Sequence, residues 1–332
     1  MLTNSSILVT GGTGSFGQKF VRMTLDKYNP KRLIIFSRDE MKQWDMAAKF
    51  KQDPRLRYFI GDIRDRDRLY RALDGVDYVV HAAAMKIVPV AEYNPFECIK
   101  TVVNGAMNVV DACIDVGVKR CVALSTDKAC SPINLYGASK LCSDKIFVAG
   151  NSYAGSRATR FSVVRYGNVM GSRGSIIPYF RSLAHTGRLP ITDKRMTRFM
   201  ISLDQGVELV WKAFDDMVGG EIYVKKIPSM KVVDIARTIA PEGDFDEIGI
   251  RPGEKLHEMM ISSEDARTTY EYEGYYIILP QIHDWSDDVI RIKDGKHCPE
   301  GFAYASDTNA EWMTPGELRD WMKEEYRNSA SK

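Results

Sequence analysis

Long hydrophobic runs are absent from this 332-residue sequence, and none approaches the roughly 18 apolar residues that a membrane-spanning helix needs. The N-terminal segment, MLTNSSILVTGG, is too short and polar to be a secretory signal peptide. Charge of one sign is also lacking, because the net charge is only +2 and no basic tail is present. This balance disfavours a dedicated nucleic-acid-binding protein. We therefore expect a cytoplasmic protein that binds neither a membrane nor nucleic acid.

Cysteine spacings of the CxxC or CxxH type are missing too, although the chain has six cysteines. Most of them lie in apolar contexts, as buried free thiols do, and a reducing compartment suits them. His81 and His257 have no partners at the spacing that metal ligands show. We therefore expect these histidines to have structural roles, and we expect no metal site.

Strand-like and helix-like segments alternate over residues 6–166. The apolar runs lie at 6–10, 32–36, 57–60, 77–80, 120–125 and 160–166, and the clearest helical segments at 94–117 and 136–153. This alternation predicts a parallel sheet with helices on both faces, whose strands read as solid apolar runs. The predicted fold class is therefore α/β, a Rossmann-type doubly wound parallel sheet.

The pattern is weaker in the second half of the chain. Residues 167–178 are rich in glycine and read as a loop, whereas 202–217 and 231–240 read as helices. We expect residues 1–166 to form the Rossmann domain that carries the catalytic residues. Residues 167–332 should form mainly a smaller C-terminal substrate-binding unit, and later segments can return to the first domain.

A glycine-rich turn follows the first predicted strand. Gly11, Gly14 and Gly17 have GxxGxxG spacing between an apolar strand and a helix, the context of a dinucleotide-binding turn. The first glycine permits a tight turn, the second lets a pyrophosphate approach, and the third lets helix and strand pack closely. N–H groups at the helix start then face the phosphates. The same turn adds three expected cofactor contacts, Thr13, Ser15 and Phe16; a purely structural turn is the alternative.

The end of the second predicted strand bears on which dinucleotide binds. An NAD-selective site usually places an acidic residue there to bind the ribose 2′-hydroxyl. Here Ser37 occupies that position, followed by Arg38 and, a turn later, Lys42. A hydroxyl and two cations suit a 2′-phosphate, because arginine makes charge-assisted, bidentate hydrogen bonds with it. We therefore expect NADP; the alternative is that both cations are solvated and Asp39 binds the ribose.

Two further strand ends complete the expected cofactor site. The segment GDIRD follows the third predicted strand and places Asp62 and Ile63 where they can hold the adenine. The segment HAAAMK follows the fourth predicted strand. The small side chains of Ala82 and Ala83 in that segment let a cofactor lie across the strand ends.

The stretch STDKACSPINLYGASK combines an acid, a phenol and two ammonium groups. Tyr136 and Lys140 are four residues apart, so they lie on one face of the predicted helix. Tyrosine has a solution pKa of about 10, and a neighbouring cation favours its phenolate. After a dinucleotide fingerprint, this YxxxK pair predicts a base that removes a hydroxyl proton while hydride leaves the same carbon.

Together these features resemble the extended short-chain dehydrogenase/reductase superfamily. A larger set of motifs resembles the inverting UDP-N-acetylglucosamine 4,6-dehydratases of the pseudaminic acid pathway: TGGTGSFG, SRDEMK, HAAAMKIVPVAEYNPFECIKT, STDKA, NLYGASK, RYGNVMGSRGS, PITD, MTRF and GIRPGEKLHE. The match runs from residue 6 to about 260, with another patch, SDTNAEW, at 306–312. The resemblance implies an NADP-dependent lyase that converts UDP-N-acetylglucosamine into UDP-2-acetamido-2,6-dideoxy-β-L-arabino-4-hexulose.

The resemblance also implies roles for the catalytic stretch. Tyr136 takes the proton of the sugar's 4-hydroxyl, and Lys140 orients the nicotinamide ribose. Thr126 hydrogen-bonds near the 4-oxygen. Asp127 is the acid for the departing 6-hydroxyl, and Lys128 is the base at carbon 5.

Six substrate contacts are implied in the same way. They are Lys86, Asn168, Arg173, Thr192, Arg251 and Glu254. Lys86 meets both cofactor and substrate, Asn168 and Arg173 cradle the diphosphate, and the other three lie at the uridine end. Arg173 could instead be an ordinary loop charge.

Lys128 distinguishes the chain from other subclasses. Retaining dehydratases usually carry Asp–Glu at positions 127 and 128, and simple epimerases carry small polar or apolar residues. A lysine acts as a base only if its pKa falls from about 10.4, and we expect burial beside Lys140, Lys86 or the cofactor to lower it. The alternative is that Asp127 and Lys128 form a solvent-facing ion pair.

The same fold supports two other functions. A sugar-nucleotide 4-epimerase would not need the acid–base pair at 127–128. A non-enzymatic NADP-sensing protein would often lack a member of the YxxxK pair. For either function, as for the dehydratase, the helices at 94–117 and 136–153 are the usual dimer-forming pair of the superfamily, so the resemblance implies a dimer or an assembly of dimers.

Overall fold

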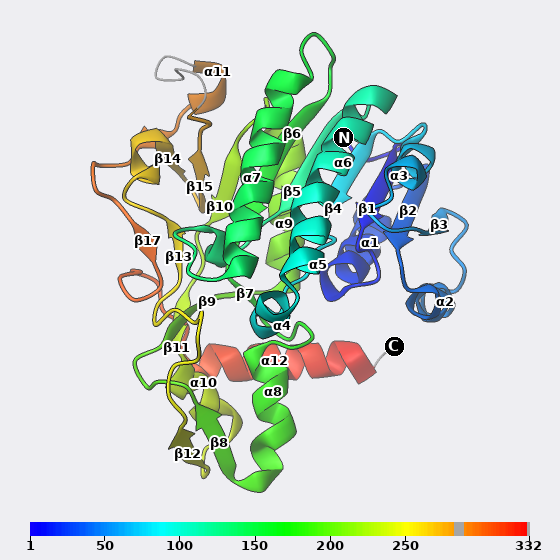
Figure 1. Cartoon of the computed structure of the whole chain (residues 1–332). Helices are drawn as coiled ribbons and strands as arrows, with labels where there is room; N and C mark the ends of the chain where they lie inside the picture. Colours follow the sequence, from blue (N-terminus) through cyan, green and yellow to red (C-terminus); the bar gives the residue numbers. More distant parts are fainter. Residues whose placement is uncertain (282–288, 331–332) are drawn as a thin grey trace.

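The computed structural model describes residues 1–281 and 289–330. Its larger part is a ten-stranded sheet with helices on both faces, and a smaller lobe lies below it (Figure 1). Seven neighbouring strands are parallel, in the order β3-β2-β1-β4-β5-β6-β10. They are β1 (Ser6–Thr10), β2 (Arg32–Ser37), β3 (Leu56–Ile60), β4 (Tyr78–His81), β5 (Arg120–Leu124), β6 (Arg160–Arg165) and β10 (Ile222–Lys225). This is the Rossmann order, so the predicted fold class is confirmed.

Antiparallel strands extend the sheet beyond β10. They are β15 (Tyr275–Ile278), β14 (Thr269–Tyr272) and β16 (Lys296–His297). The chain therefore returns to the large sheet after residue 166, first with β10 and then with these three strands. Later segments therefore complete the sheet.

Helices cover both faces of the sheet. One face carries α3 (Arg66–Leu73), α6 (Gly105–Val116) and α7 (Leu135–Tyr153), and the other carries α1 (Ser15–Lys27) and α9 (Leu203–Asp216) (Figure 1). The remaining helices of this part are α2 (Glu40–Lys49), α4 (Val88–Tyr93), α5 (Pro95–Ile99) and α11 (Val289–Ile292).

The helix predicted at 94–117 is not uniform. It consists of α5, a π-helical turn η1 (Lys100–Asn104) and α6. Where α6 begins, a Cβ on Gly105 would lie 2.7 Å from Cδ1 of Ile63, so glycine allows the helix to approach the segment after β3. Insertions of this kind in helices are frequent at functional sites, and this one is followed by the helix that packs against α7.

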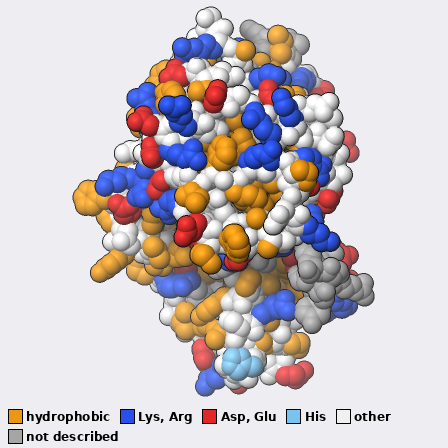
Figure 2. All heavy atoms as spheres, turned by 90° about the vertical axis from the view of Figure 1, so that its right-hand side faces the viewer, with side chains coloured by type: hydrophobic (Ala, Val, Ile, Leu, Met, Phe, Trp, Pro, Cys, Tyr) orange, Lys and Arg blue, Asp and Glu red, His pale blue; other side chains and the backbone are white. Residues whose placement is uncertain are grey.

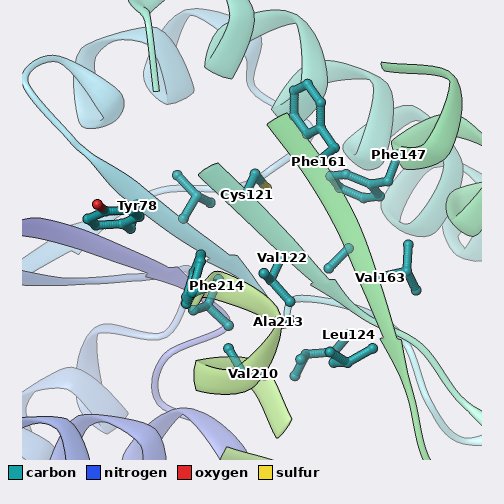
Figure 3. Packing of buried hydrophobic residues seen from close by; sticks show 14 of the residues in the cluster. Tyr78, Cys121, Val122, Leu124, Phe147, Phe161, Val163, Val210, Ala213 and Phe214 are labelled. Atoms are coloured by element: carbon teal, nitrogen blue, oxygen red, sulfur yellow. The ribbon is translucent and has the colours of Figure 1, made fainter. Parts of the chain in front are cut away.

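The core lies on both faces of the central strands. Figure 3 shows Val122 of β5 between Val210 and Phe214 of α9 and Phe147 of α7, with Phe161 of β6 beside the last. All five side chains are buried. The solid apolar runs that predicted these strands are explained by burial on both faces.

The smaller lobe has its own core and small sheets. A three-stranded sheet has the order β11-β9-β7, and two pairs are β8–β12 and β13–β17. The bounds are β7 (Asn168–Val169), α8 (Ile176–Leu183), β8 (Arg188–Ile191), β9 (Thr197–Ile201), β11 (Ser229–Lys231), α10 (Val232–Ile239), β12 (Asp244–Glu247), β13 (Met259–Ile261), β17 (Tyr304–Ala305) and α12 (Pro315–Ala330). The loop predicted at 167–178 thus contains β7 and the first turn of α8.

The surface shows mixed charge. On the face in Figure 2, Lys and Arg side chains are interspersed with Asp and Glu side chains. No helix within residues 1–281 and 289–330 is long and apolar enough to cross a bilayer. In the same residues no group of three His, Cys, Asp or Glu side chains could hold a metal ion. All six cysteines are free thiols, and only Cys142 is exposed.

Candidate active site

The candidate site begins at the carboxyl end of β5. Thr126 caps the short 3₁₀ turn η2 (Asp127–Ala129), and its hydroxyl accepts a hydrogen bond from the N–H of Lys128 at 3.4 Å. The N–H of Asp127 donates to the carbonyl of Tyr166, just past β6, at 3.2 Å. Because the carboxyl ends of parallel strands share one edge of a Rossmann sheet, η2 lies where ligands bind in this fold.

Helix α7 packs its first turn against η2. Asn134 caps α7 by accepting from the N–H of Gly137 at 2.7 Å. A Cβ on Gly137 would lie only 2.2 Å from the carbonyl oxygen of Lys128, so this contact requires glycine. The close approach brings Tyr136 beside η2, where Thr126 and Lys128 lie near enough to lower the pKa of its phenol. The structure therefore brings the predicted catalytic residues together.

Burial sets the protonation of Tyr136 and Lys140. Burial raises the pKa of Tyr136 to about 12, although Lys128 and the hydrogen bond from Thr126 oppose the rise. The ammonium of Lys140 donates to the carbonyl of Leu124 at 2.6 Å. Burial lowers the pKa of Lys140, and the nearby carboxylate of Asp144 counteracts that effect.

A third charged group joins the Asp127–Lys128 pair. The ammonium nitrogen of Lys128 lies 3.0 Å from Oδ1 of Asp127 and 2.9 Å from Oε1 of Glu258. Nε of Arg198 lies 3.8 Å from the same Glu258 oxygen. Asp127 and Glu258 are only 1% and 2% exposed. The alternative of a solvent-facing ion pair is therefore wrong, because the carboxylates of this cluster are buried.

The expected fall in the pKa of Lys128 is not observed in this cluster. Burial alone would lower the pKa of Lys128, but Asp127 and Glu258 outweigh burial and raise it above its usual value. Burial and the charge of Glu258 raise the pKa of Asp127, which suits an acid. The expectation failed because it weighed burial and neighbouring cations, whereas the carboxylates of Asp127 and Glu258 outweigh them.

Glu258 and Arg198 are the residues that sequence reasoning missed. Both stand in quoted motifs, GIRPGEKLHE and MTRF, but neither received a role. Glu258 directly precedes the apolar strand β13, and Arg198 lies inside the fully buried strand β9. A charged residue within or beside an apolar strand was the available signal, since buried charges need partners.

The glycine-rich turn fits a dinucleotide. Gly11 has a left-handed φ of 65°, and a Cβ there would lie 2.9 Å from Ala83. A Cβ on Gly17 would lie 2.4 Å from the carbonyl oxygen of Gly12, so the first turn of α1 packs on the turn after β1 at a distance that glycine allows. Gly14 caps α1 without a side-chain hydrogen bond, so the helix start offers its N–H groups to an anion.

Other predicted cofactor residues surround this turn. The hydroxyls of Thr13 and Ser37 are 2.9 Å apart, and Phe16 stacks on Tyr166 with ring centroids 6.5 Å apart. The N–H groups of Ala82 and Ala83 donate to the hydroxyl of Thr10, at 3.1 and 3.2 Å, which joins the ends of β4 and β1. These hydrogen bonds place the small side chains of Ala82 and Ala83 at the carboxyl ends of the strands, as the predicted cofactor site requires.

The expected adenosine end contains paired charges. Arg38 is 60% exposed, and its Nη1 lies 3.5 Å from Asp62. Oδ2 of Asp62 also pairs with Nη2 of Arg64 at 2.7 Å. Lys42 lies 2.5 Å from Asp39, the residue that caps α2. The side chain of Ile63 is buried in the core, so only its backbone remains for a role at the adenine.

Comparison with known proteins identifies the family. The family model described as "Polysaccharide biosynthesis protein" matches residues 7–280. The chain belongs to this family. It is 56% identical over 326 residues to a protein of Campylobacter jejuni named UDP-N-acetylglucosamine 4,6-dehydratase (inverting), with 96% of this chain and 97% of that protein covered. The resemblance predicted from the motifs is therefore confirmed.

Solved structures of relatives have the same fold. The X-ray structure of Pen from Bacillus thuringiensis aligns with a TM-score of 0.88 at 34% identity, covering 97% of this chain and 99% of that chain. DesIV, a dTDP-glucose 4,6-dehydratase from Streptomyces venezuelae determined with NAD bound, aligns with a TM-score of 0.69 at 26% identity, covering 76% and 86%. The predicted Rossmann architecture is thus shared with an enzyme that holds a nicotinamide cofactor.

Within this member of the polysaccharide biosynthesis protein family, the loop after β6 covers the glycine-rich turn. The ammonium of Lys86 donates to the carbonyl of Arg173 at 2.6 Å, and the N–H of Arg173 donates to the hydroxyl of Ser15 at 3.4 Å. Oδ1 of Asn168, in the same loop, is buried without a hydrogen-bond partner among the described residues. The loop therefore lies between the expected cofactor turn and Lys86, with an amide oxygen still to be satisfied.

The residues expected at the uridine end lie in the smaller lobe. Thr192 is half-buried in the turn after β8. Arg251 and Glu254 form an ion pair with each other. The second carboxylate oxygen of Glu254 is buried and has no hydrogen-bond partner among the described residues. Gly253, between them, accepts a hydrogen bond from Asn134 at 2.7 Å, which ties this segment to the start of α7.

Proposed function

We propose that this protein is an NADP-dependent UDP-N-acetylglucosamine 4,6-dehydratase that inverts carbon 5 of the sugar. The observation that carries the proposal is the ion pair between the buried Asp127 and the half-buried Lys128, beside Tyr136. Epimerisation at carbon 4 needs no acid and base at this place, whereas loss of water across carbons 5 and 6 needs both. The name of the 56% identical Campylobacter relative supports the same activity.

The proposed reaction assigns a task to each side chain. Tyr136 removes the proton of the 4-hydroxyl, with Thr126 beside the 4-oxygen and Lys140 at the nicotinamide ribose. A nicotinamide dinucleotide held by the turn after β1 would supply the redox chemistry, as hydride acceptor for carbon 4 and hydride donor for carbon 6. The ketone acidifies the proton on carbon 5. Lys128 takes that proton, and Asp127 gives one to the departing 6-oxygen.

The geometry of the turn after β1 supports a dinucleotide, and the charges after β2 favour NADP. Ser37 ends β2, Arg38 follows it directly, and Lys42 lies in the first turn of α2. Asp39, the alternative ribose ligand, already caps α2 and pairs with Lys42. Asp39 and Lys42 are thus paired with each other, and Arg38, which is 60% exposed, is the cation most open to a 2′-phosphate.

Arg38→Ala should weaken NADP binding far more than NAD binding. Hydrogen bonds to charged groups contribute about 1.5–3 kcal/mol, so the loss in NADP affinity should be roughly 10- to 100-fold. Titration of the protein with each dinucleotide, followed by calorimetry, measures the difference. Arg71→Ala removes an arginine from α3 and is the matched control. Equal losses for NADP and NAD would refute the 2′-phosphate assignment.

The partners of this activity are proposed on the same basis. UDP-N-acetylglucosamine is the substrate, with Asn168, Arg173 and Lys86 at the diphosphate, and the product enters the cytoplasmic synthesis of pseudaminic acid.

A homo-oligomer is supported by exposed hydrophobic side chains on α4 and α5, where Tyr93 is 88% and Phe96 is 77% exposed. Light scattering of the purified protein tests the assembly.

Incubation with UDP-N-acetylglucosamine in deuterated water, followed by proton NMR and mass spectrometry, tests the function. The product should have lost one water, should carry deuterium at carbon 5 and should show the couplings of an L-arabino ring. A product with the mass of the substrate and an inverted carbon 4 would identify an epimerase instead. Tight binding of NADP with no turnover of any UDP-sugar would identify a sensing protein.

A further inference from the structure

Glu258 is a buried carboxylate that the proposed reaction leaves without a task. It is 2% exposed, and its Oε1 lies 2.9 Å from the ammonium nitrogen of Lys128. Its Oε2 is buried and has no hydrogen-bond partner among the described residues. A buried carboxylate is costly unless it is paired. The group that pairs with Glu258 is the proposed base at carbon 5.

The backbone around Glu258 is held in place by the C-terminal part of the chain. The N–H of Glu258 donates to the hydroxyl of Ser306 at 2.9 Å, and the N–H of Ser306 donates to the carbonyl of Glu258 at 2.8 Å. The same hydroxyl lies 2.6 Å from that of Thr197 in β9. The two hydrogen bonds with Ser306 hold the backbone of Glu258 in place beside η2. Ser306 is the first residue of the SDTNAEW patch, so this patch supports the catalytic cluster.

Lys128 can take a proton from carbon 5 only as a neutral amine. In the cluster its pKa is raised by Asp127 and Glu258, so the ammonium form prevails. The ammonium proton must therefore move to an acceptor that is already in contact. Asp127 has to hold a proton of its own for the departing 6-oxygen. The remaining acceptor within hydrogen-bond distance is Oε1 of Glu258.

We propose that Glu258 accepts the proton of Lys128 and so makes this lysine a base during dehydration. An N–H bond of Lys128 breaks and an O–H bond forms on Glu258, which leaves a neutral amine beside a neutral acid. The amine then takes the proton of carbon 5. The electron pair of that C–H bond forms the double bond to carbon 6 as the 6-oxygen leaves with the proton of Asp127. With hydride returned to carbon 6, the ammonium of Lys128 reprotonates carbon 5, and Glu258 returns its proton to the amine. The proton that Tyr136 took from the 4-hydroxyl balances the one that left Asp127 with the water.

The charges around Glu258 keep its carboxylate ionised and make it a weak base, so the proton transfer from Lys128 is an uphill step that is completed when the amine takes the proton of carbon 5. Lys128 and Asp127 face it from η2, Arg198 from β9, and Lys255 from its own segment. Burial alone would raise the pKa of Glu258, but Lys128 and Arg198 outweigh burial and lower it. Glu258 is thus ionised before the reaction, while the pKa of Asp127 is raised. The two carboxyl groups are therefore divided into a proton acceptor and a proton donor.

Glu258→Gln keeps the size of the side chain and removes the acceptor. This inference rests on the proposed function, so the variant is compared with the wild-type protein on UDP-N-acetylglucosamine in deuterated water. Oxidation at carbon 4, followed by the absorbance of the reduced cofactor in a single turnover, should be close to the wild-type rate. Incorporation of deuterium at carbon 5 should slow by about 100-fold, the lower range for loss of a general base. A purely structural role would slow both steps equally.

Two further variants complete the test. Glu258→Asp keeps a carboxylate and should recover part of the exchange at carbon 5, and Glu264→Gln, an exposed acid on the same segment, should behave as wild type. In the wild-type protein, exchange should fall as the pH is lowered and Glu258 becomes protonated. That acid limb should be absent from Glu258→Gln.

The outcomes are separable. Deuterium exchange at the wild-type rate in Glu258→Gln would overturn the proposed relay. If Glu258→Gln does not fold, Glu258→Asp decides, and equal slowing of oxidation and exchange in that variant would also overturn it. If the wild-type protein itself releases no water from UDP-N-acetylglucosamine, the proposed function fails, and the relay fails with it for a different and recognisable reason.

Discussion

Tyr136→Phe should reduce turnover by about 100- to 10,000-fold, the usual loss when a general base is removed. The ring stays in place, so the packing against Val102 and Ala91 is kept and the variant should fold. Because oxidation at carbon 4 comes first, no reduced cofactor should form even transiently. Stopped-flow absorbance with UDP-N-acetylglucosamine measures this step directly.

The pH dependence of the oxidation gives a second test of Tyr136. Burial raises the pKa of Tyr136 to about 12, so the phenol form prevails at neutral pH. The base is the phenolate, whose fraction grows as the pH rises toward that pKa. The oxidation rate of the wild-type protein should therefore increase with pH. Tyr153→Phe, an exposed change at the other end of α7, should leave both rate and profile unchanged. Near-normal turnover of Tyr136→Phe would mean that another residue is the base.

The strands of the parallel sheet could be predicted because their signal is local. The first six predicted strands agree with β1 to β6 within one residue at each end. A strand that is buried on both faces reads as a solid apolar run whatever its neighbours are. The return of β10, β14 and β15 to the same sheet depends on contacts across the chain, and no local pattern specifies it.

Helix α12 shows a signal that was present but unused. Pro315 stands at its first position. The N–H of Glu317 donates to the hydroxyl of Thr314 at 3.2 Å, and the carboxylate of Glu317 accepts from the N–H of Thr314 at 2.7 Å. This reciprocal pattern is a capping box, and proline at the first helical position is a common helix start. The start of α12 could therefore have been predicted from the sequence, although the C-terminal third has only weak periodicity.

The candidate site divides in the same way into local and distant parts. Thr126, Tyr136 and Lys140 lie within one short stretch, so spacing on a strand end and a helix was enough to predict that they converge. Glu258 reaches Lys128 from a segment 130 residues later in the chain, and tertiary packing alone brings it there. Asp127 and this distant charge together raise the pKa of Lys128, and the contribution of Glu258 could not be predicted from local spacing.

Lys128→Ala should permit oxidation at carbon 4 but stop the reaction before water is lost. Tyr136 and Lys140 remain, so reduced cofactor should form and then persist.

The same variant, Lys128→Ala, should also be less stable. It leaves Asp127 and Glu258 buried without the ammonium between them, and breaking a buried pair costs about 3–5 kcal/mol of unfolding free energy. The pKa of Asp127 should then lie further above its unfolded value, so the loss should grow as the pH rises through that pKa. Denaturant unfolding at several pH values measures it, with Lys145→Ala, an exposed change on α7, as control.

The stereochemistry of the product tests Lys128 most directly. Inversion requires that carbon 5 lose a proton on one face and gain one on the other. Lys128 lies between two carboxylates that come from different segments, Asp127 on η2 and Glu258 before β13, and its flexible stem can carry the amine between positions. The wild-type product should therefore be the L-arabino hexulose with deuterium at carbon 5 when the reaction runs in deuterated water. A D-xylo product would overturn the inverting assignment and would leave the dehydratase activity, and the roles of Tyr136 and Asp127, intact.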